Sequence, residues 1–201
     1  MNGHYIQDPW SIIEEGWDPS LQEASESVFS LGNGRMGQRA NFEEPYTGET
    51  LLGNYLAGVY YPDKTRVGWW KNGYPEYFAK VLNAPNWIGI GVEINGDSLD
   101  LHKWKPLDFR RELNMHQGYL ERAFTIVSRG ARLHIKVKRF LSMKRDEIGA
   151  IRYAVRSEDF TGTLSFIPFI DGNVVNRDSN YGEHFWEMEE TVAGKRTARL
   201  M

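Results

Sequence analysis

The sequence contains no cysteine, which excludes a disulfide framework, a thiolate nucleophile and a metal site with cysteine ligands. It also lacks an excess of positive charge, since 24 Lys and Arg residues stand against 27 Asp and Glu residues. The formal net charge is therefore −3 at pH 7. Nucleic-acid-binding domains present basic patches to the phosphate backbone, so the composition gives no support for a nucleic-acid partner.

Long apolar runs are absent as well. No segment approaches the ~18 consecutive apolar residues of a membrane-spanning helix. The opening residues, MNGHYIQDPW, lack the basic and apolar regions of a secretion signal. We therefore expect no membrane partner and a cytoplasmic location.

Aromatic residues are plentiful: 7 Trp, 10 Tyr and 10 Phe make up 13% of the 201 residues. Apolar residues account for 41% and charged residues for 25%, as in ordinary globular proteins. A chain of this length can bury a sizeable core in one large domain. The aromatic surplus either fills a wide core or lines a flat apolar ligand site, for example one for sugars.

Apolar and polar residues alternate along much of the chain, which is typical of strands with one buried face. In residues 131–138 this alternation is regular, and it breaks at Arg139–Phe140, as an extra residue in a β-bulge would cause. Ser11–Glu15 is expected to form one helical turn, and Val28–Leu31 a strand. The other predicted strands are 88–94, 118–127, 151–156 and 163–170.

The chain is therefore predicted to be all-β, an antiparallel β-sandwich with few helical turns. Asn-Gly pairs at 33–34, 72–73 and 95–96 predict tight turns between strands, because both residues tolerate positive φ. Ten residues are expected to face one core: Ile88, Ile90, Val92, Ile94, Leu133, Ile135, Val137, Ile151, Tyr153 and Val155.

One aromatic stretch, within the proline- and glycine-rich residues 43–85, offers the best candidates for a binding or interface role. Its loops mix flat rings with charges, a combination that can grip sugar hydroxyls. Packing that anchors the loop, or a contact with another domain or subunit, would use the same residues. The candidates are Tyr60, Tyr61, Asp63, Lys64, Arg66, Trp69 and Trp70.

Other motifs are weaker. Residues 32–37 spell G-x-G-x-x-G, but no helical pattern follows, so a glycine-rich hairpin is favoured over a dinucleotide site. Glu43 and Glu44 would point to opposite faces if extended, whereas Glu187 and Glu189 would share a strand face at roughly 7 Å. Neither pair is taken as the catalytic pair that glycoside hydrolysis requires.

The five histidines show neither metal-ligand spacing nor a triad with Ser and Asp. No metal and no catalytic residue is therefore expected in this chain. A basic stripe is interpreted as a solvated strand face or a contact with another domain, rather than as an anion site. It comprises Arg132, His134, Lys136 and Lys138.

Four motif segments resemble glycoside hydrolase family sixty-five. They are residues 26–44 (ESVFSLGNGRMGQRANFEE), 113–122 (LNMHQGYLER), 139–142 (RFLS) and 170–176 (IDGNVVN). Their order and separation match the family from about residue 10 to 176. The departures are the additional Asn41, and Asn114 where relatives usually have Asp. The run 60–70 is similar to a branch of the family usually labelled maltose phosphorylase.

The resemblance implies an N-terminal, supersandwich-like β domain followed by a helical linker, an (α/α)6 barrel and a small C-terminal β domain. The general acid and the phosphate-binding groups of the family belong to the barrel. We therefore expect residues 1–201 to be a single N-terminal sandwich domain, a fragment of a larger enzyme without the barrel and inactive by itself. Its C-terminal residues, 196–201, resemble a strand cut short.

For the parent enzyme, the resemblance implies inverting phosphorolysis, or hydrolysis, of an α-glucosidic bond. Inorganic phosphate would be the co-substrate, and this chain would need no cofactor. The expected partners are the barrel of the same protein, a second subunit in a homodimer and the α-glucoside. The alternative is an autonomous carbohydrate-binding module that uses exposed Trp69, Trp70 or Trp87.

Overall fold

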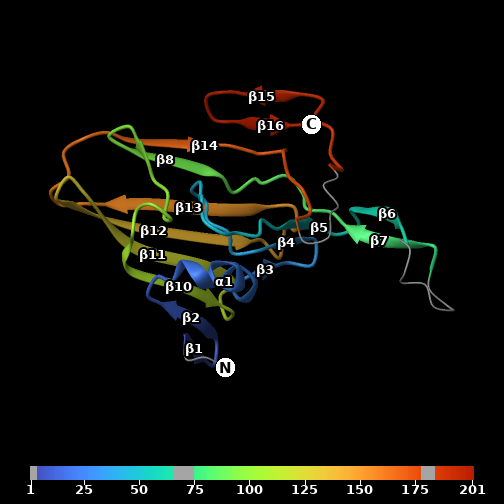
Figure 1. The fold of residues 1–201 in the computed structure, drawn as a ribbon, viewed down its shortest axis with the longest axis horizontal. Coiled ribbons are helices and arrows are strands. Elements are labelled where there is room, and N and C mark those ends of the chain that lie inside the picture. The colour runs from blue at the N-terminus through green and yellow to red at the C-terminus, as the bar shows by residue number, and fades with distance from the viewer. Residues whose placement is uncertain (1–3, 66–74, 178–183) are drawn as a thin grey trace.

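A computed structural model describes residues 4–65, 75–177 and 184–201 (Figure 1). Its largest sheet has six antiparallel strands in the order β1-β2-β10-β11-β12-β13. These strands are β1 (Tyr5–Asp8), β2 (Ser11–Glu15), β10 (Leu107–Asn114), β11 (Tyr119–Ser128), β12 (Ala131–Leu141) and β13 (Gly149–Arg156).

A smaller sheet supplies the second layer, in the order β14-β8-β9. Its strands are β8 (Ile90–Ile94), β9 (Asp97–Ser98) and β14 (Leu164–Pro168). Val92 and Ile94 of β8 share one buried cluster with Phe124 of β11 and Ile135 of β12. The chain is thus an antiparallel β-sandwich, as predicted.

The remaining elements are short. A 3₁₀ turn (Pro19–Leu21) leads into α1 (Gln22–Val28), and a three-stranded sheet contains β3 (Leu31–Gly32), β4 (Met36–Gln38) and β5 (Asn54–Leu56). Two hairpins complete the fold: β6 (Tyr60–Lys64) with β7 (Tyr77–Val81), and β15 (Thr191–Ala193) with β16 (Ala198–Leu200). In Figure 1 the β6–β7 hairpin extends away from the sandwich on the right, and the β15–β16 hairpin lies along the top. No helix in the described part of the chain is long and apolar enough to cross a membrane.

The predicted core is largely confirmed. Nine of the ten residues belong to the main buried cluster or pack against it. The tenth, Ile88, is buried just before β8 begins. Strict alternation therefore identified the strand segments whose inner face is largely apolar.

The predictions for the N-terminal region were wrong. Ser11–Glu15 is a strand, held on one side by β1 and on the other by β10. Residues 22–28 form a helix where none was expected, and of the predicted strand 28–31 only Leu31 is extended, as the first residue of β3. The buried residues of α1 are Gln22, Ser25 and Glu26. A helix that buries polar side chains has no apolar period by which a sequence reader could find it.

The expected bulge at Arg139–Phe140 is also absent. β12 pairs with β13 in continuous register through Leu141, and its alternation holds throughout. Arg139 occupies a core position with 1% of its surface exposed, whereas Phe140 is 43% exposed on the outside. The apparent break of phase is therefore a buried arginine in an inward-facing position. A true shift of register lies in β10, between Leu107 and Arg110.

The Asn-Gly turns are confirmed where they can be seen. Asn95 and Gly96 have φ values of 55° and 87° and connect β8 to β9, as a type I′ hairpin requires. In the β3–β4 turn the Asn33 side chain accepts hydrogen bonds from the amides of Arg35 and Met36. The third pair, 72–73, lies outside the described residues.

Replacing a core residue of β12 tests this arrangement. We expect Ile135→Asp to abolish cooperative folding, because a carboxylate would be placed without a partner among aliphatic side chains. The matched control, Arg132→Asp on the outer face of the same strand, should keep a cooperative thermal transition by circular dichroism. A cooperative transition in Ile135→Asp would contradict the assignment of this face to the core.

Candidate functional site

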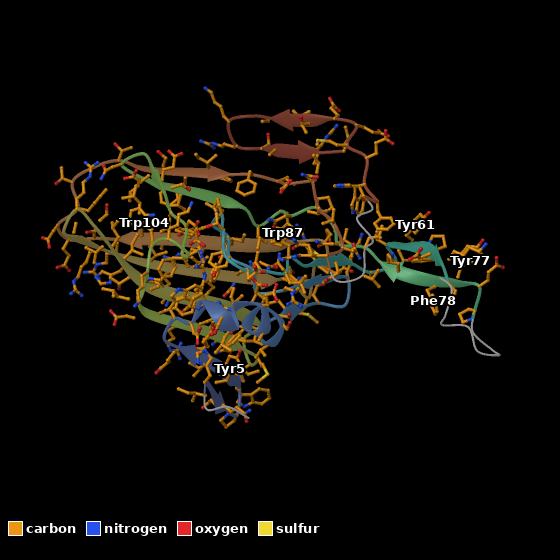
Figure 2. All side chains as sticks on the ribbon, in the orientation of Figure 1. Tyr5, Tyr61, Tyr77, Phe78, Trp87 and Trp104 are labelled. Carbon is orange, nitrogen blue, oxygen red and sulfur yellow. The ribbon has the colours of Figure 1, made fainter. Side chains whose placement is uncertain are left out.

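Four of the seven candidate residues lie on strand β6: Tyr60, Tyr61, Asp63 and Lys64. The other three, Arg66, Trp69 and Trp70, lie outside the described residues. Figure 2 shows Tyr61, Tyr77 and Phe78 gathered on the extended β6–β7 hairpin, away from the main body of side chains. The structure thus brings the described candidates together on one element, and a binding or interface role for the seven residues stays a prediction.

Side chains alternate between the two faces of this hairpin. The pairs Tyr60↔Val81, Pro62↔Ala79 and Lys64↔Tyr77 form one face, here called the Tyr60 face. The pairs Tyr61↔Lys80 and Asp63↔Phe78 form the opposite one, the Tyr61 face. The candidate residues therefore divide into two sets that point in opposite directions.

The Tyr61 face is braced from within the domain. Lys80 Nζ lies 2.6 Å from Asp63 Oδ2, and the Tyr61 ring lies 5.0 Å from the ring of Phe185. Lys80 Nζ also lies 5.2 Å from the centre of that ring. Next to Phe185, the Trp186 indole donates to the carbonyl of Asn83, just after β7. This face fixes the hairpin to residues 185–186.

The Tyr60 face is open. Tyr60 is 58% exposed and Val81 54% exposed, and Tyr77 beside them is exposed as well. A groove of about 360 Å³ runs between this face and strands β4 and β5, and its wall includes Met36, Leu56 and Val59. The groove is largely apolar, and an aromatic face continues from it along the hairpin.

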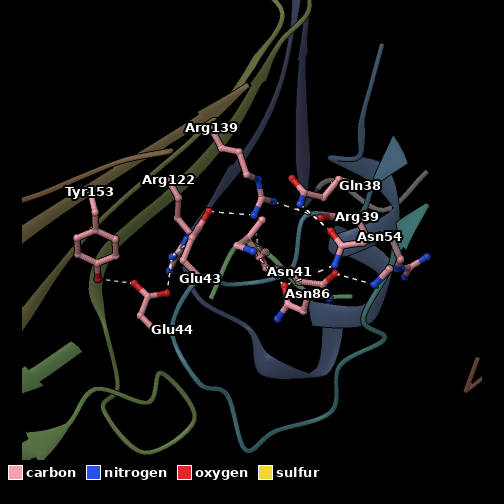
Figure 3. Close-up of polar contacts among 12 residues, drawn as sticks. Gln38, Arg39, Asn41, Glu43, Glu44, Asn54, Asn86, Arg122, Arg139 and Tyr153 are labelled. Atoms are coloured by element: carbon pink, nitrogen blue, oxygen red, sulfur yellow. Dashed lines mark hydrogen bonds and ion pairs between the residues drawn. The ribbon is translucent and has the colours of Figure 1, made fainter. Parts of the chain in front are cut away.

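The domain also contains a buried charge cluster. We define it as Arg111, Arg122, Arg139, Glu14, Glu43 and Glu44. Each of these residues is at most 4% exposed. Arg122 Nη2 lies 2.7 Å from Glu43 Oε2 and 2.5 Å from Glu44 Oε2. Arg139 Nη1 donates to Glu43 Oε1 at 3.0 Å. Figure 3 shows both arginines reaching from the sheet to the loop that carries the glutamates.

Aromatic side chains enclose the cluster. The guanidinium of Arg122 lies 4.5 Å from the ring centre of Phe42, and that of Arg111 lies 5.3 Å from the same ring. Arg111 is also paired with Glu14 at 3.3 Å and donates to Gln22 of α1 at 2.7 Å. Stacking on aromatic faces favours buried arginine, because a guanidinium is weakly hydrated and planar.

The cluster shifts the pKa values of its members. Burial alone would raise the pKa of Glu43, but the charges of Arg139 and Arg122 outweigh it, and the net pKa is lowered. Burial and the nearby Glu44 carboxylate raise the pKa of Tyr153, whose hydroxyl donates to Glu44 at 2.5 Å. Burial also lowers the pKa of Arg111 to about 10. The arginine pairings therefore favour the ionised form of Glu43.

The structure argues against a catalytic role for either carboxylate pair. Glu43 and Glu44 do not point to opposite faces as expected: they lie in a loop and converge on Arg122. A carboxylate with a lowered pKa and no access to solvent is a poor general acid. Glu187 and Glu189, which would share one face of an extended strand, lie in irregular, exposed chain ahead of β15.

Arg139 of the charge cluster donates to the carbonyl of Arg39 at 3.2 Å, and a chain of hydrogen bonds among amides begins at the neighbouring Gln38 (Figure 3). Gln38 Nε2 donates to Asn54 Oδ1 at 2.7 Å, and the backbone amide of Asn54 donates to Asn83 Oδ1 at 2.9 Å. The backbone amide of Asn83 in turn donates to Asn176 Oδ1 at 2.8 Å. Asn176 returns a hydrogen bond to the carbonyl of Val81, the last residue of β7. These side chains set the direction in which the hairpin leaves the sandwich.

The four motif segments meet through these contacts. The first segment meets the second where Glu44 pairs with Arg122, and it meets the third where Asn33 donates to the carbonyl of Ser142 at 2.9 Å. It is joined to the fourth segment by the amide chain that ends at Asn176. Considered alone, each of these polar residues would be expected to face solvent, so the sequence does not indicate that the segments are neighbours.

The basic stripe lies on the exposed side of β12, whereas His4 lies beside Glu14 of the charge cluster. His4 and Ser25 both contact Glu14 Oε1, at 2.9 and 2.8 Å, so the serine hydroxyl is not activated by the imidazole. No group of three or more His, Asp or Glu side chains among the described residues is placed to hold a metal ion. Lys136 and Lys138 lie on the outer sheet face and share Glu121 at 2.7 and 3.0 Å.

Residues 12–200 match the family model described as "Glycosyl hydrolase family 65, N-terminal domain". The maltose phosphorylase of Bacillus subtilis is 44% identical over 96% of this chain and 26% of its own length. The α,α-trehalose phosphorylase of Thermoanaerobacter brockii is 33% identical over 86% of this chain and 23% of its own length.

A solved structure of a kojibiose phosphorylase candidate from the human microbiome superposes with a TM-score of 0.84 and 27% identity. The match covers 98% of this chain and 26% of that one. The chain thus spans about a quarter of the length of the curated relatives it matches.

Removing one arginine tests the charge cluster. We expect Arg122→Met to lower the free energy of unfolding by about 3–5 kcal/mol, because two carboxylates would stay buried without their shared cation. The control is Lys136→Met on the neighbouring strand, whose exposed pair with Glu121 should contribute at most about 1 kcal/mol. Urea unfolding measures the free energy of unfolding of both variants. Equal losses in the two variants would contradict the role of Arg122 as the shared cation of Glu43 and Glu44.

Acid should weaken the cluster in a defined direction. The folded-state pKa of Glu43 lies below its ordinary value of 4.5. Its contribution is therefore complete above about pH 4.5 and is lost as the pH falls through the folded-state pKa. The free energy of unfolding should fall less steeply between pH 5 and 3 in Glu43→Gln than in the parent. The exposed control Glu15→Gln should keep the parent slope, and the same slope in Glu43→Gln would count against this account.

Proposed function

Because the chain belongs to the N-terminal domain family of glycosyl hydrolase family 65, we propose that it is the non-catalytic N-terminal domain of a longer disaccharide phosphorylase. The proposed parent reaction is inverting phosphorolysis of an α-glucosidic bond of the maltose type, with inorganic phosphate as co-substrate. The general acid and the phosphate-binding groups would lie in an (α/α)6 barrel outside residues 1–201. Maltose is favoured over other disaccharides by the 44% identity to a maltose phosphorylase.

One observation carries the non-catalytic assignment: the adjacent carboxylates Glu43 and Glu44 are locked by Arg122 and Arg139 inside the domain. Phosphorolysis needs a general acid that can reach the leaving oxygen and give up a proton. Neither glutamate meets this requirement, because both carboxylates are buried and hydrogen-bonded to Arg122. Their role is to hold the domain together.

The β6–β7 hairpin supports the second half of the proposal, which is an interface. Tyr60 and Tyr61 are exposed rings on an ordered two-stranded element, with Asp63 and Lys64 between them and the tip. Large rings with few rotamers give contact area at a low entropic cost. The partners we propose are the barrel of the same protein and a second subunit in a homodimer, with Arg66, Trp69 and Trp70 extending the contact.

A second candidate function is a carbohydrate-binding module. It is favoured by one observation: Tyr60 and Tyr77 expose their rings on the same hairpin face. The indole of Trp87, by contrast, is half-buried and lies where a side chain at Gly149 would be. Saturable binding of maltotriose below about millimolar, or ~−4 kcal/mol, that is lost in Tyr60→Ala would favour this alternative.

Activity assays test the main proposal. The 201-residue chain incubated with maltose and inorganic phosphate should release no glucose 1-phosphate, whereas the longer protein that contains it should release glucose 1-phosphate and glucose. Glucose 1-phosphate from the short chain would contradict the non-catalytic assignment. A longer protein without phosphorolytic activity on any α-linked glucose disaccharide would contradict the parent reaction.

A further inference from the structure

The Tyr60 face of the hairpin and the groove beside it form one continuous surface. Tyr60, Ala79 and Val81 belong to both, since they lie on this face and also line the groove. The opposite wall comes from β4 and β5 and includes Met36 and Leu56. Arg35 is the only charged residue among the described residues that line the groove.

This surface differs from the other side of the hairpin in what covers it. Phe185 and the Lys80–Asp63 pair occupy the Tyr61 face. On the Tyr60 face, Tyr60 and Val81 keep more than half of their surface exposed. Contiguous exposed apolar surface in a soluble domain marks a place where something binds. The Tyr61 face also keeps exposed rings, since Tyr61 is 45% and Phe78 43% exposed. The Tyr60 face differs because it continues into the groove, and together they form the surface available for docking.

The size of the surface decides between occupants. Five-residue strands with a ~3.4 Å rise and a ~4.8 Å spacing give a hairpin face of roughly 17 by 10 Å. Even with the groove, this is well below the ~800 Å² per partner of a standard stable complex. Contacts between domains of one chain are smaller, from about 600 Å² in total. A second copy meeting only this surface would not remain bound, whereas a tethered segment would.

We propose that the Tyr60 face and its groove receive an apolar segment of the same longer protein, from the part outside residues 1–201. This inference rests on the proposed function and names the partner of the hairpin. The relatives matched here are about four times as long as this chain, so a large part of such a protein is available to dock. Covalent linkage gives that segment an effective concentration in the millimolar range, which compensates for a small contact area.

The proposed segment is apolar because the groove is. Methionine, leucine, valine and tyrosine side chains make up most of its wall, and a charged side chain placed there would lose water without gaining a partner. The guanidinium of Arg35, the charged residue of the lining, lies 3.6 Å from the carboxylate of Asp146. The Tyr61 face would take no part, and its residues act by holding the hairpin at the correct angle.

Cysteine labelling in the longer protein tests the proposal, and residues 1–201 contribute no cysteine of their own. Val81→Cys and Ala79→Cys place a thiol on the Tyr60 face, and Val127→Cys places one at a position on β11 that is exposed to a similar degree. Any cysteines in the rest of the protein are first replaced with serine. Maleimide labelling of Val81→Cys and Ala79→Cys should be at least ~10-fold slower than that of Val127→Cys in the native protein. All three rates should become equal in urea.

Each other outcome would overturn the proposal. Equal native rates would mean that the face is uncovered. Protection that disappears on dilution would assign the surface to a second copy, and protection that needs added maltose would assign it to a saccharide. Thermal unfolding of each variant confirms that it is folded, and Ala79→Cys serves if Val81→Cys is not. Phosphorolysis assayed on the same samples separates the two claims, since protection without activity would contradict only the proposed function.

Discussion

The pairing of Arg122 with Glu43 and Glu44 is the interaction on which the rest of the domain depends. It joins a central strand of the large sheet to a loop that has no strand partner of its own. Burying charges is costly, and a buried ion pair is not by itself a source of stability. What it provides is position, because two carboxylates around one guanidinium leave few alternative arrangements. The Glu43 carbonyl then accepts from the Ile90 amide at 2.8 Å, which attaches the loop to the start of β8.

This view also explains what the polar residues of the four motif segments do in this chain. Their charged and amide side chains make hydrogen bonds within the domain. Asn33 donates to two carbonyls of the turn between β12 and β13, and Asn176 donates to the carbonyl at the end of β7. The domain uses its polar residues internally and leaves aromatic and aliphatic residues outside, on the hairpin. Such an arrangement suits a domain that presents a surface to the rest of a larger protein.

The sequence predicted the elements that depend on patterns of neighbouring residues. Period-two alternation found β11, β12 and β13, and the Asn95–Gly96 pair found its hairpin. It failed where a polar residue is buried. The buried Arg139 was interpreted as a bulge, and the buried polar residues Gln22 and Glu26 left α1 unpredicted. Glu43 and Glu44, which would point to opposite faces in extended chain, converge instead on Arg122 in a loop. In each case the compensating partner is far away in sequence, so no short window contains the information. The candidate hairpin was recognised from composition, but its two unlike faces follow only from the register of β6 and β7.

The central claim is that the Arg122 pairing positions the loops and, through the amide chain, the hairpin. Native-state hydrogen exchange in Arg122→Met tests this directly. The amides of Ile90 and Ala84, which donate to Glu43 and Asn54, should exchange faster by a larger factor than those of the β11–β12 ladder. That pattern would mean that the loops open locally while the sheet is still folded. An equal acceleration of every amide would show that Arg122 contributes only to global stability, and the account would be wrong.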